Sequence, residues 1–398
     1  MKHEIIYERS DLFDVNMVIT IIIDIAGKPV ETDLKEAFQK AVRVNEILLS
    51  KIVIESDGRA FYVDNDLPES SIRVVEEEFD LIRQQEQKVR FRTEDGEFIR
   101  AFAKENDNGM SVMFLMNHIA GDGKSLEYFI EDFMTFLSGG SKDYKKIRTA
   151  ETKENLDSVS RGIIRYYNRR WKDKVFTFED MQNAYEDYWN NRTTVIEVET
   201  TEKSEMDKIL EECRKSGVKF TSYLTAKLIK DENKMMAVGY AMDYRHDSNR
   251  SMGNQASGFS IKYKYNPSKS IFENARKIQK KIDKKIKAHE NGSYILSFVS
   301  GLKRTLNDAV NLEHTGNYHD KISYSLAKLM GYVGKTKDYS ITNLTVIDIP
   351  TKYGEYEITG MLFAGPVVSY GKYIVSVVTC NGKTVITRHK RVENKSVI

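Results

Sequence analysis

The sequence has few cysteines and prolines. Its 398 residues include two cysteines, Cys213 and Cys380, and five prolines. Two cysteines so far apart, with no C-x-x-C pair, argue against a disulfide framework and against a thiolate metal site. The scarcity of proline and the lack of any low-complexity tract predict little disorder.

The sequence also lacks a long apolar run. The longest, Met17–Ile25, is interrupted by Thr20 and Asp24 and is too short to span a bilayer. The first residues, Met1–Arg9, contain neither the apolar core nor the small-residue cleavage site of a secretory signal. We therefore expect no membrane span and a reducing, cytoplasmic setting.

Charge of neither sign is in clear excess. Charged residues make up 30% of the chain, yet the formal net charge is only +2. Proteins whose main partner is nucleic acid usually carry a clear basic excess, so this balance argues against such a partner. Hydrophobic residues at 40% and aromatic residues at 11% are ample for buried cores.

The length exceeds that of one typical domain and predicts two domains or two fused halves. We divide the chain into a first half (1–145), a helical crossover or linker (146–192) and a second half (193–398). The crossover is rich in Lys, Arg, Asp, Glu, Tyr and Asn. Strand and helix patterns interleave without a strict βαβ period, which predicts a mixed α/β chain with α+β layers.

Several elements can be placed from local patterns. The β-branched stretch Val15–Ile25 predicts a buried strand. Residues 98–104 and 110–116 predict a hairpin across the turn Asn106–Gly109. Asp33 and Thr221 are each predicted to cap the helix that follows.

The most informative stretch is 110–137. An apolar run, Met110–Met116, predicts a buried strand, and apolar residues at helical spacing after Gly123 predict a helix. Between them lies Asn117-His118-Ile119-Ala120-Gly121-Asp122-Gly123. A histidine and an aspartate thus occupy a glycine-bearing turn between a strand and a helix, where backbone and side chains are accessible to a ligand.

The chemistry of His118 and Asp122 leaves several interpretations open. Their spacing resembles two metal ligands, but no third ligand is near, and His314 and His319 do not complete a set. The chain has no G-x-S-x-G elbow for a Ser–His–Asp triad. A neutral imidazole at a strand end suits direct general-base catalysis. The alternative is an ordinary turn residue, since Asp-Gly is a common turn pair.

The motif Asn117–Gly123 resembles the HHxxxDG motif of the superfamily of condensation domains and chloramphenicol-acetyltransferase-like acyltransferases. The resemblance extends over about the full length of the chain. Within the superfamily, the sequence most resembles free-standing members similar to alcohol O-acetyltransferases. Blocks that resemble the family pattern are residues 16–54, "GVKFTSYLTAK" (217–227), "AMDYR" (241–245), "GNQASGF" (253–259) and "SITNLTVID" (340–348).

The resemblance implies a fold and a set of roles. Two acetyltransferase-like halves would form a V with an active-site tunnel between them, entered by the thioester donor from one face and the acceptor from the other. His118 would be the general base, Asp122 would form a buried ion pair with Arg245, and Gly123 would let the helix start close to the strand. Asn343 would stabilise the oxyanion or line the tunnel.

Two departures from the family pattern affect the expected function. Asn117 occupies the position of the first histidine of the family motif. This difference makes a peptide-forming condensation domain less expected than an ester-forming relative. No carrier-protein segment is apparent, which favours a diffusible acyl-CoA, acetyl-CoA in the first place, as co-substrate, with no bound cofactor or metal. We expect a monomer that acylates the hydroxyl or amine of a small molecule. Condensation of carrier-protein-bound substrates and a non-catalytic relative of the fold stay open as alternatives.

A row of basic residues lies in the predicted helix 274–287. It consists of Arg276, Lys277, Lys280, Lys281, Lys284, Lys285 and Lys287. We interpret it as the solvated face of an amphipathic helix. The alternative is a docking surface for an acidic carrier protein or for the phosphates of CoA.

Overall fold

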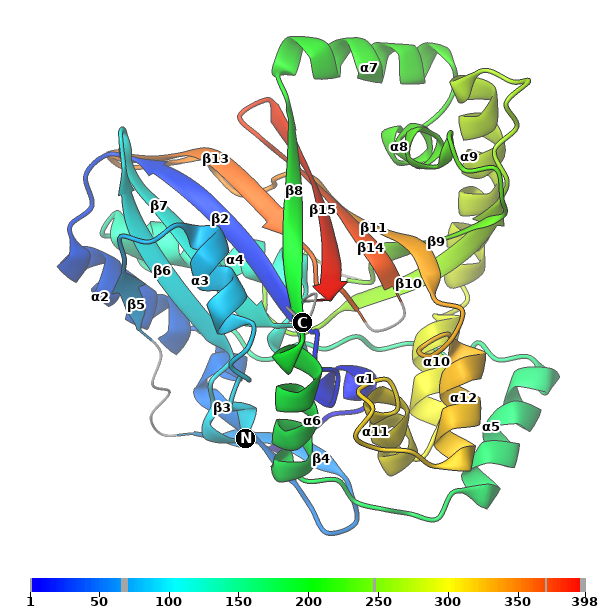
Figure 1. Cartoon of the computed structure of the whole chain (residues 1–398). Coiled ribbons are helices and arrows are strands. Elements are labelled where there is room, and N and C mark those ends of the chain that lie inside the picture. Colours follow the sequence, from blue (N-terminus) through cyan, green and yellow to red (C-terminus); the bar gives the residue numbers. More distant parts are fainter. Residues whose placement is uncertain (1, 66–70, 246–247, 369–370, 394–398) are drawn as a thin grey trace, which may run out of the picture.

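The computed structural model describes residues 2–65, 71–245, 248–368 and 371–393, and it contains two large mixed sheets (Figure 1). The first has the strand order β12-β13-β2-β7-β6-β5. Its strands are β2 (Val18–Ala26), β5 (Ile72–Val74), β6 (Ile99–Asn106), β7 (Gly109–Asn117), β12 (Lys352–Tyr353) and β13 (Tyr356–Ala364). β6 and β7 form the predicted hairpin, and β2 is the predicted buried strand.

Two helices, α2 (Glu31–Arg43) and α4 (Gly123–Leu137), pack against this sheet and against each other. Aromatic side chains form the contact between these two helices and β7. The ring of Phe129 on α4 lies 5.8 Å from that of Phe114 on β7 and 5.6 Å from that of Phe38 on α2, measured between centroids. These rings are fully buried, so they fix the direction in which α4 leaves the turn after β7.

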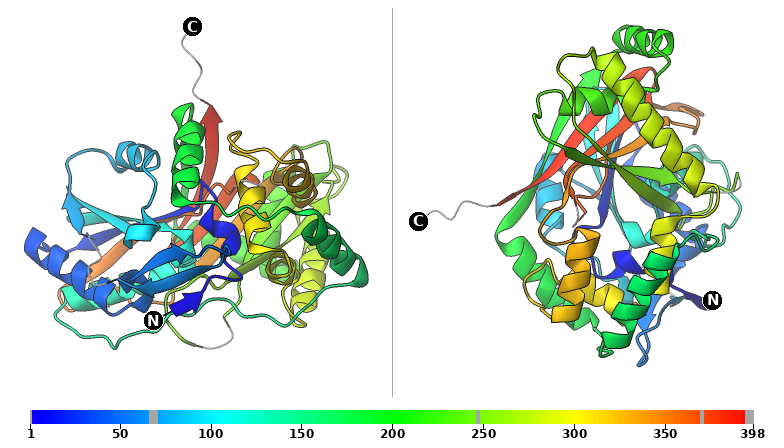
Figure 2. Two further views of the ribbon diagram at one scale, coloured as in Figure 1. Left: turned by 90° about the horizontal axis from the view of Figure 1, so that it is seen from below. Right: turned by 90° about the vertical axis from the view of Figure 1, so that its right-hand side faces the viewer.

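The second large sheet has the order β10-β9-β11-β14-β15-β8. Its strands are β8 (Arg192–Thr201), β9 (Met236–Asp243), β10 (Ala256–Tyr263), β11 (Lys337–Val346), β14 (Gly371–Cys380) and β15 (Lys383–Glu393). The helices α7 (Lys203–Lys215), α8 (Phe220–Ile229) and α9 (Ile271–His289) belong to this half, and α9 packs on α8 and β10 (Figures 1 and 2).

Most of the remaining elements lie below the two sheets in Figure 1, whereas α3 (Phe79–Glu86) lies in front of the first sheet. A small sheet, β1-β4-β3, sits beside the first half. Short segments and helices complete the chain: β1 (Lys2–Glu4), α1 (Arg9–Leu12), η1 (Glu46–Leu49), β3 (Ser50–Ile54), β4 (Ala60–Asp64), α3 (Phe79–Glu86), η2 (Thr93–Asp95), η3 (His118–Ala120), α5 (Ser158–Arg170), α6 (Phe178–Asn190), α10 (Tyr294–Gly301), α11 (Arg304–Leu312) and α12 (Lys321–Met330).

The predicted second half contributes two strands to the first sheet. β12 and β13 come late in the chain, within the predicted second half, yet β13 pairs antiparallel with β2 of the first sheet. The division at residue 193 therefore does not describe the first sheet, which needs residues from both sides of it. The physical reason is the free edge of β2, whose backbone N–H and C=O groups would otherwise stay unpaired.

Two predicted helix caps are wrong. α2 begins at Glu31, before Asp33, and α8 begins at Phe220, before Thr221. Neither helix has a side chain bonded at its N-cap. No helix in the described part of the chain is both long and apolar enough to cross a membrane.

Candidate active site

The turn after β7 presents His118 at the junction of the two halves. The backbone N–H of His118 donates to the carbonyl oxygen of Met17 at 2.8 Å, and the Asn117 side chain accepts from the N–H of Ile119. Gly123 opens α4 where a Cβ atom would lie 3.0 Å from the ring of Phe363 and 3.1 Å from Leu344. These two residues belong to β13 and β11, so glycine lets the helix start close to both sheets.

Asp122 is bound by groups from both halves. The two terminal nitrogens of Arg245 lie 3.0 Å from its two carboxylate oxygens, and the side chains are only 4% (Arg245) and 6% (Asp122) exposed. The backbone N–H groups of Ser125 and Gln255 also donate to the carboxylate, each at 2.9 Å. Burial alone would raise the pKa of Asp122, but the charge of Arg245 and these hydrogen bonds outweigh it and lower the pKa. The turn is thus fastened to the second half by a buried, bidentate ion pair.

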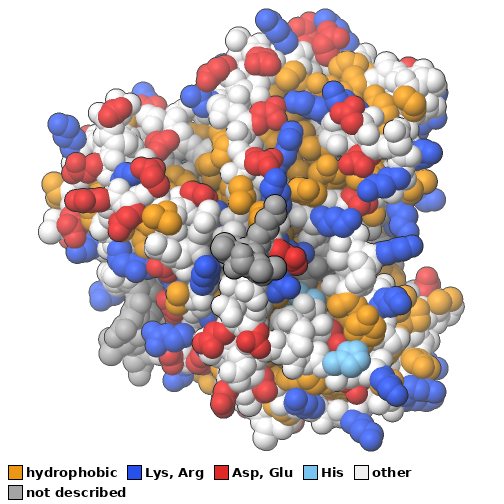
Figure 3. All heavy atoms as spheres, in the orientation of Figure 1, with side chains coloured by type: hydrophobic (Ala, Val, Ile, Leu, Met, Phe, Trp, Pro, Cys, Tyr) orange, Lys and Arg blue, Asp and Glu red, His pale blue; other side chains and the backbone are white. Residues whose placement is uncertain are grey.

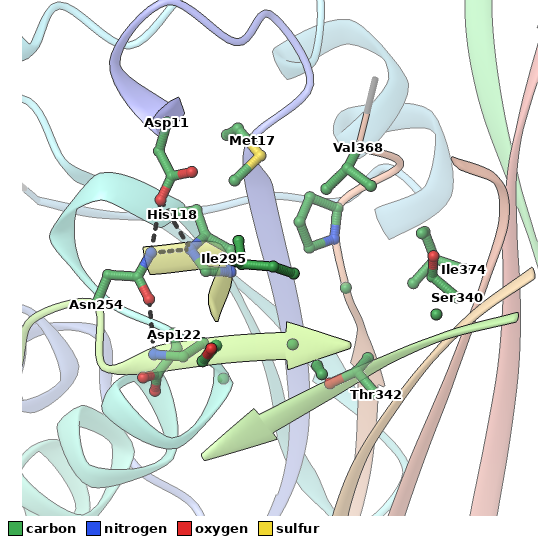
Figure 4. A pocket seen from close by; sticks show the side chains of 18 of the residues that line it. Asp11, Met17, His118, Asp122, Asn254, Ile295, Ser340, Thr342, Val368 and Ile374 are labelled. Atoms are coloured by element: carbon green, nitrogen blue, oxygen red, sulfur yellow. Dashed lines mark hydrogen bonds and ion pairs between the residues drawn. The ribbon is translucent and has the colours of Figure 1, made fainter. Parts of the chain in front are cut away.

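His118 lies beside two polar side chains that the sequence analysis did not single out. The amide nitrogen of Asn254 lies 3.0 Å from Nδ1 of His118 and 2.6 Å from Oδ2 of Asp11 (Figure 4). Oδ2 of Asp11 itself lies 3.7 Å from Nδ1. Asn254 therefore bridges the histidine to a carboxylate from α1, near the start of the chain.

The orientation of the Asn254 amide decides which ring nitrogen carries the proton. Its oxygen accepts from the N–H of Ala256 at 3.0 Å, so its nitrogen points at Asp11 and at Nδ1. Neutral His118 then carries its proton on Nε2. Turning the amide over would break its hydrogen bond from the N–H of Ala256. It would offer its oxygen to a proton on Nδ1 and to a protonated Asp11, and would leave Nε2 free to act as a base. Burial raises the pKa of Asp11, which favours the protonated carboxyl that this second arrangement needs.

His118, Asp11 and Asn254 border a cavity of about 210 Å³. Figure 4 shows Ser340, Thr342 and Ile374 on the side of this cavity opposite Asp11 and Asn254. The apolar part of the lining includes Met17, Ile19, Ile295, Leu296, Phe363, Val368 and Ile374. Such a space, mostly apolar with a few convergent polar groups, is typical of a small-molecule site.

Asn343 does not line this cavity. Its amide nitrogen is directed to the hydroxyl of Thr221 on α8, at 3.3 Å. Its neighbour Thr342 lines the cavity instead, because successive side chains of a strand point to opposite faces. Lys337, at the start of the same strand, also borders the cavity, and burial lowers the pKa of its amine to about 8.

Glu8 is a buried carboxyl next to this site. It is 3% exposed, and no side chain among the described residues is hydrogen-bonded to its carboxyl oxygens. Burial raises the pKa of Glu8 to about 8, and the negative charge of Asp11 adds to the effect. The folded protein therefore keeps this carboxyl neutral at pH 7.

We expect Glu8→Gln to stabilise the protein increasingly from pH 5 to pH 8. The unfolded chain ionises Glu8 above its ordinary pKa of 4.5, while the folded protein holds the proton up to about pH 8. The folded state binds more protons in this window, so the wild type loses about 1.4 kcal/mol of stability per pH unit there, which glutamine does not. Urea unfolding of both proteins at pH 5, 6, 7 and 8 measures the difference. A difference that does not change with pH would contradict a buried neutral Glu8.

The charged residue between Glu8 and Asp11 anchors α1. Arg9 donates to both carboxylate oxygens of Asp308 on α11, with Nε at 2.7 Å, and to the carbonyl oxygen of Gly58 at 2.9 Å. The side chains of Arg9 and Asp308 are 0% and 1% exposed. This pair fixes the segment from which Asp11 reaches His118.

No protein-family model matches the chain, and no curated protein matches it in sequence. Solved structures do match in fold. The first condensation domain of the CDA synthetase is similar with a TM-score of 0.62 and 10% identity, over 96% of this chain and 87% of that one. Polyketide synthase associated protein 5 from Mycobacterium tuberculosis gives a TM-score of 0.61 and 13% identity, over 98% and 94%.

A third similar structure is the starter condensation domain of rhizomide synthetase, a mutant in complex with C8-CoA and Leu-SNAC. It matches with a TM-score of 0.62 and 9% identity, over 98% of this chain and 88% of that one. The fold expected from the HxxxDG motif is thereby confirmed. The chain has the fold of these condensation domains, a mixed α/β architecture built on two large sheets.

Proposed function

We propose that this protein transfers an acyl group from a CoA thioester to the hydroxyl or amine of a small acceptor, with His118 as general base. The observation that carries the proposal is the position of His118 on the cavity, with Asn254 and Asp11 on Nδ1 and no described residue bonded to Nε2. We also propose that the protein is cytoplasmic, acts as a monomer and uses no bound cofactor.

The proposed reaction follows from that arrangement. With the Asn254 amide turned so that Nδ1 carries the proton, Nε2 of His118 takes the proton of the acceptor as its oxygen or nitrogen attacks the thioester carbonyl. In this arrangement the Nδ1 proton is donated to the amide oxygen of Asn254, which stabilises the imidazolium as it forms. The tetrahedral oxyanion needs a hydrogen-bond donor, for which the hydroxyl of Thr342 is available on the cavity wall. The C–S bond then breaks, and the CoA thiolate takes the proton back from His118.

The donor could also be bound to a carrier protein. Two of the similar structures are condensation domains of synthetases, which supports a condensation-type reaction as the second candidate. The complex of the rhizomide domain with C8-CoA supports the use of a CoA thioester by this fold. Offering the same acyl group on CoA and on a phosphopantetheinylated carrier protein distinguishes the two donors.

We expect His118→Ala to lower the rate of thiol release by about 10² to 10⁴-fold, the usual contribution of a general base. The assay follows free CoA from acetyl-CoA with a panel of small alcohols and amines. His319→Ala is the matched control, because its side chain is 65% exposed and does not line the cavity. If no acceptor in the panel gives His118-dependent thiol release, with either the CoA donor or the carrier-protein donor, the proposal that the protein is an enzyme is wrong.

A further inference from the structure

A basic groove lies beside the catalytic cavity. It has a volume of about 740 Å³ and runs between α5 and α10. We call it the arginine groove, after Arg161, Arg165 and Arg169 of α5, which line it together with Lys303. Glu154 is the one carboxylate in its lining. Lys303 is paired with Asp173 at 2.7 Å and Arg161 with Glu154, so the unbalanced positive charge of the groove lies on Arg165 and Arg169. Figure 3 shows basic side chains over α5.

The three arginines follow one face of α5 at a spacing of four residues. Like charges at this spacing destabilise an isolated helix slightly, so local helix stability does not account for them. Arg161 is partly neutralised by Glu154, at 3.0 Å. Arg165 and Arg169 are exposed and have no hydrogen bond or ion pair to any residue that the structure describes. Their guanidinium groups are therefore available to an anion.

The arginine groove and the cavity share structural elements. Tyr7 belongs to the lining of both. α10 contributes Ile295 and Leu296 to the cavity and, a few residues on, Ser297 and Ser300 to the groove. The cavity and the groove are therefore neighbours, which suits one molecule with an uncharged reactive end and an anionic end.

We propose that the arginine groove binds the phosphates of the CoA portion of the donor while the thioester lies at His118. This inference rests on the proposed function, because it assumes a CoA donor. Arginine offers planar, bidentate hydrogen bonding to phosphate oxygens, and CoA carries a diphosphate and a 3′-phosphate at the end remote from its sulfur. The basic row on α9 is the other candidate from the sequence, but none of its residues lines the cavity or the groove.

The test compares two double variants that remove the same charge. Arg165→Gln with Arg169→Gln changes the groove, and Lys280→Gln with Lys284→Gln changes exposed residues at the same spacing on α9. Calorimetric titration of each protein with CoA, 3′-dephospho-CoA and pantetheine measures the affinities. We expect the Kd of CoA to rise about tenfold or more in the groove variant and to stay at the wild-type value in the α9 variant. We expect the Kd of pantetheine, which has no phosphate, to be the same in all three proteins.

The outcomes separate this inference from the proposed function. If the wild type binds CoA and the groove variant binds it equally well, the groove assignment is wrong and the CoA donor stands. An equal loss of affinity in the α9 variant would also overturn the assignment, because the effect would then be one of overall charge. If the wild type neither binds CoA nor releases thiol from acetyl-CoA, the CoA donor itself is wrong, and the groove assignment falls with it.

Discussion

Asp122→Asn is expected to lower the free energy of unfolding by about 3 kcal/mol and to abolish most of the proposed acyl transfer. The change keeps the size of the side chain but leaves the guanidinium of Arg245, 4% exposed, without its buried counter-charge. Asp243 also contacts Arg245, at 2.9 Å, but it is 45% exposed and replaces only part of the interaction. The activity falls as well, because the same pair fastens the turn that carries His118.

Urea unfolding and the thiol-release assay measure the two effects. Lys203→Gln is the control for stability, since its ion pair with Asp207 is exposed on both sides and is worth at most about 1 kcal/mol. The double variant Asp122→Asn with Arg245→Gln removes both charges and should be more stable than Asp122→Asn alone. A fully stable Asp122→Asn protein would show that the ion pair does not hold the turn.

Arg9→Met is expected to destabilise the protein by about 3 to 5 kcal/mol, because it leaves the carboxylate of Asp308 buried and alone. Burial raises the pKa of Asp308 to about 6 even with Arg9 beside it, so the pair does not fully offset the loss of hydration. The double variant Arg9→Met with Asp308→Leu should therefore be at least as stable as the wild type.

The same variants test the role of α1 in the site. If Arg9 anchors the segment that carries Asp11, thiol release should fall in Arg9→Met and recover in the stable double variant. Equal stability of Arg9→Met and the wild type in urea would contradict the burial of this pair. Recovery of stability without recovery of activity would show that the guanidinium does more than anchor α1.

The sequence analysis located the part of the site that lies in one local motif. His118, Asp122 and Gly123 could be found because strand, turn and helix patterns adjoin there, and Arg245 followed from the family resemblance. Asp11 and Asn254 were missed, since neither sits in a pattern of its own and they meet His118 only in the folded chain. The one usable signal was "GNQASGF", which contains Asn254 and resembles a block of the family pattern.

The misplacements have local physical causes. Asn343 and Thr342 differ by one position, and in a strand one position decides which face a side chain occupies. Asp33 and Thr221 are favourable caps by residue type, but the helices begin earlier, after Val30 and Lys219. Neither of these N-cap residues makes a side-chain hydrogen bond to its helix. Hydrophobic periodicity predicts where a helix runs better than where it starts.

The pairing of β13 with β2 also has a consequence for synthesis of the protein. Ile25 and Ile358 are paired neighbours in the first sheet, yet about 330 residues separate them in the chain. At roughly 5 to 20 residues per second, the ribosome releases β2 about 20 to 70 seconds before its second partner exists. During this interval one edge of a strongly apolar strand is open to pairing with another nascent chain. Chaperones that cover exposed strand edges are therefore expected to matter more for the yield of this protein than its final stability would indicate.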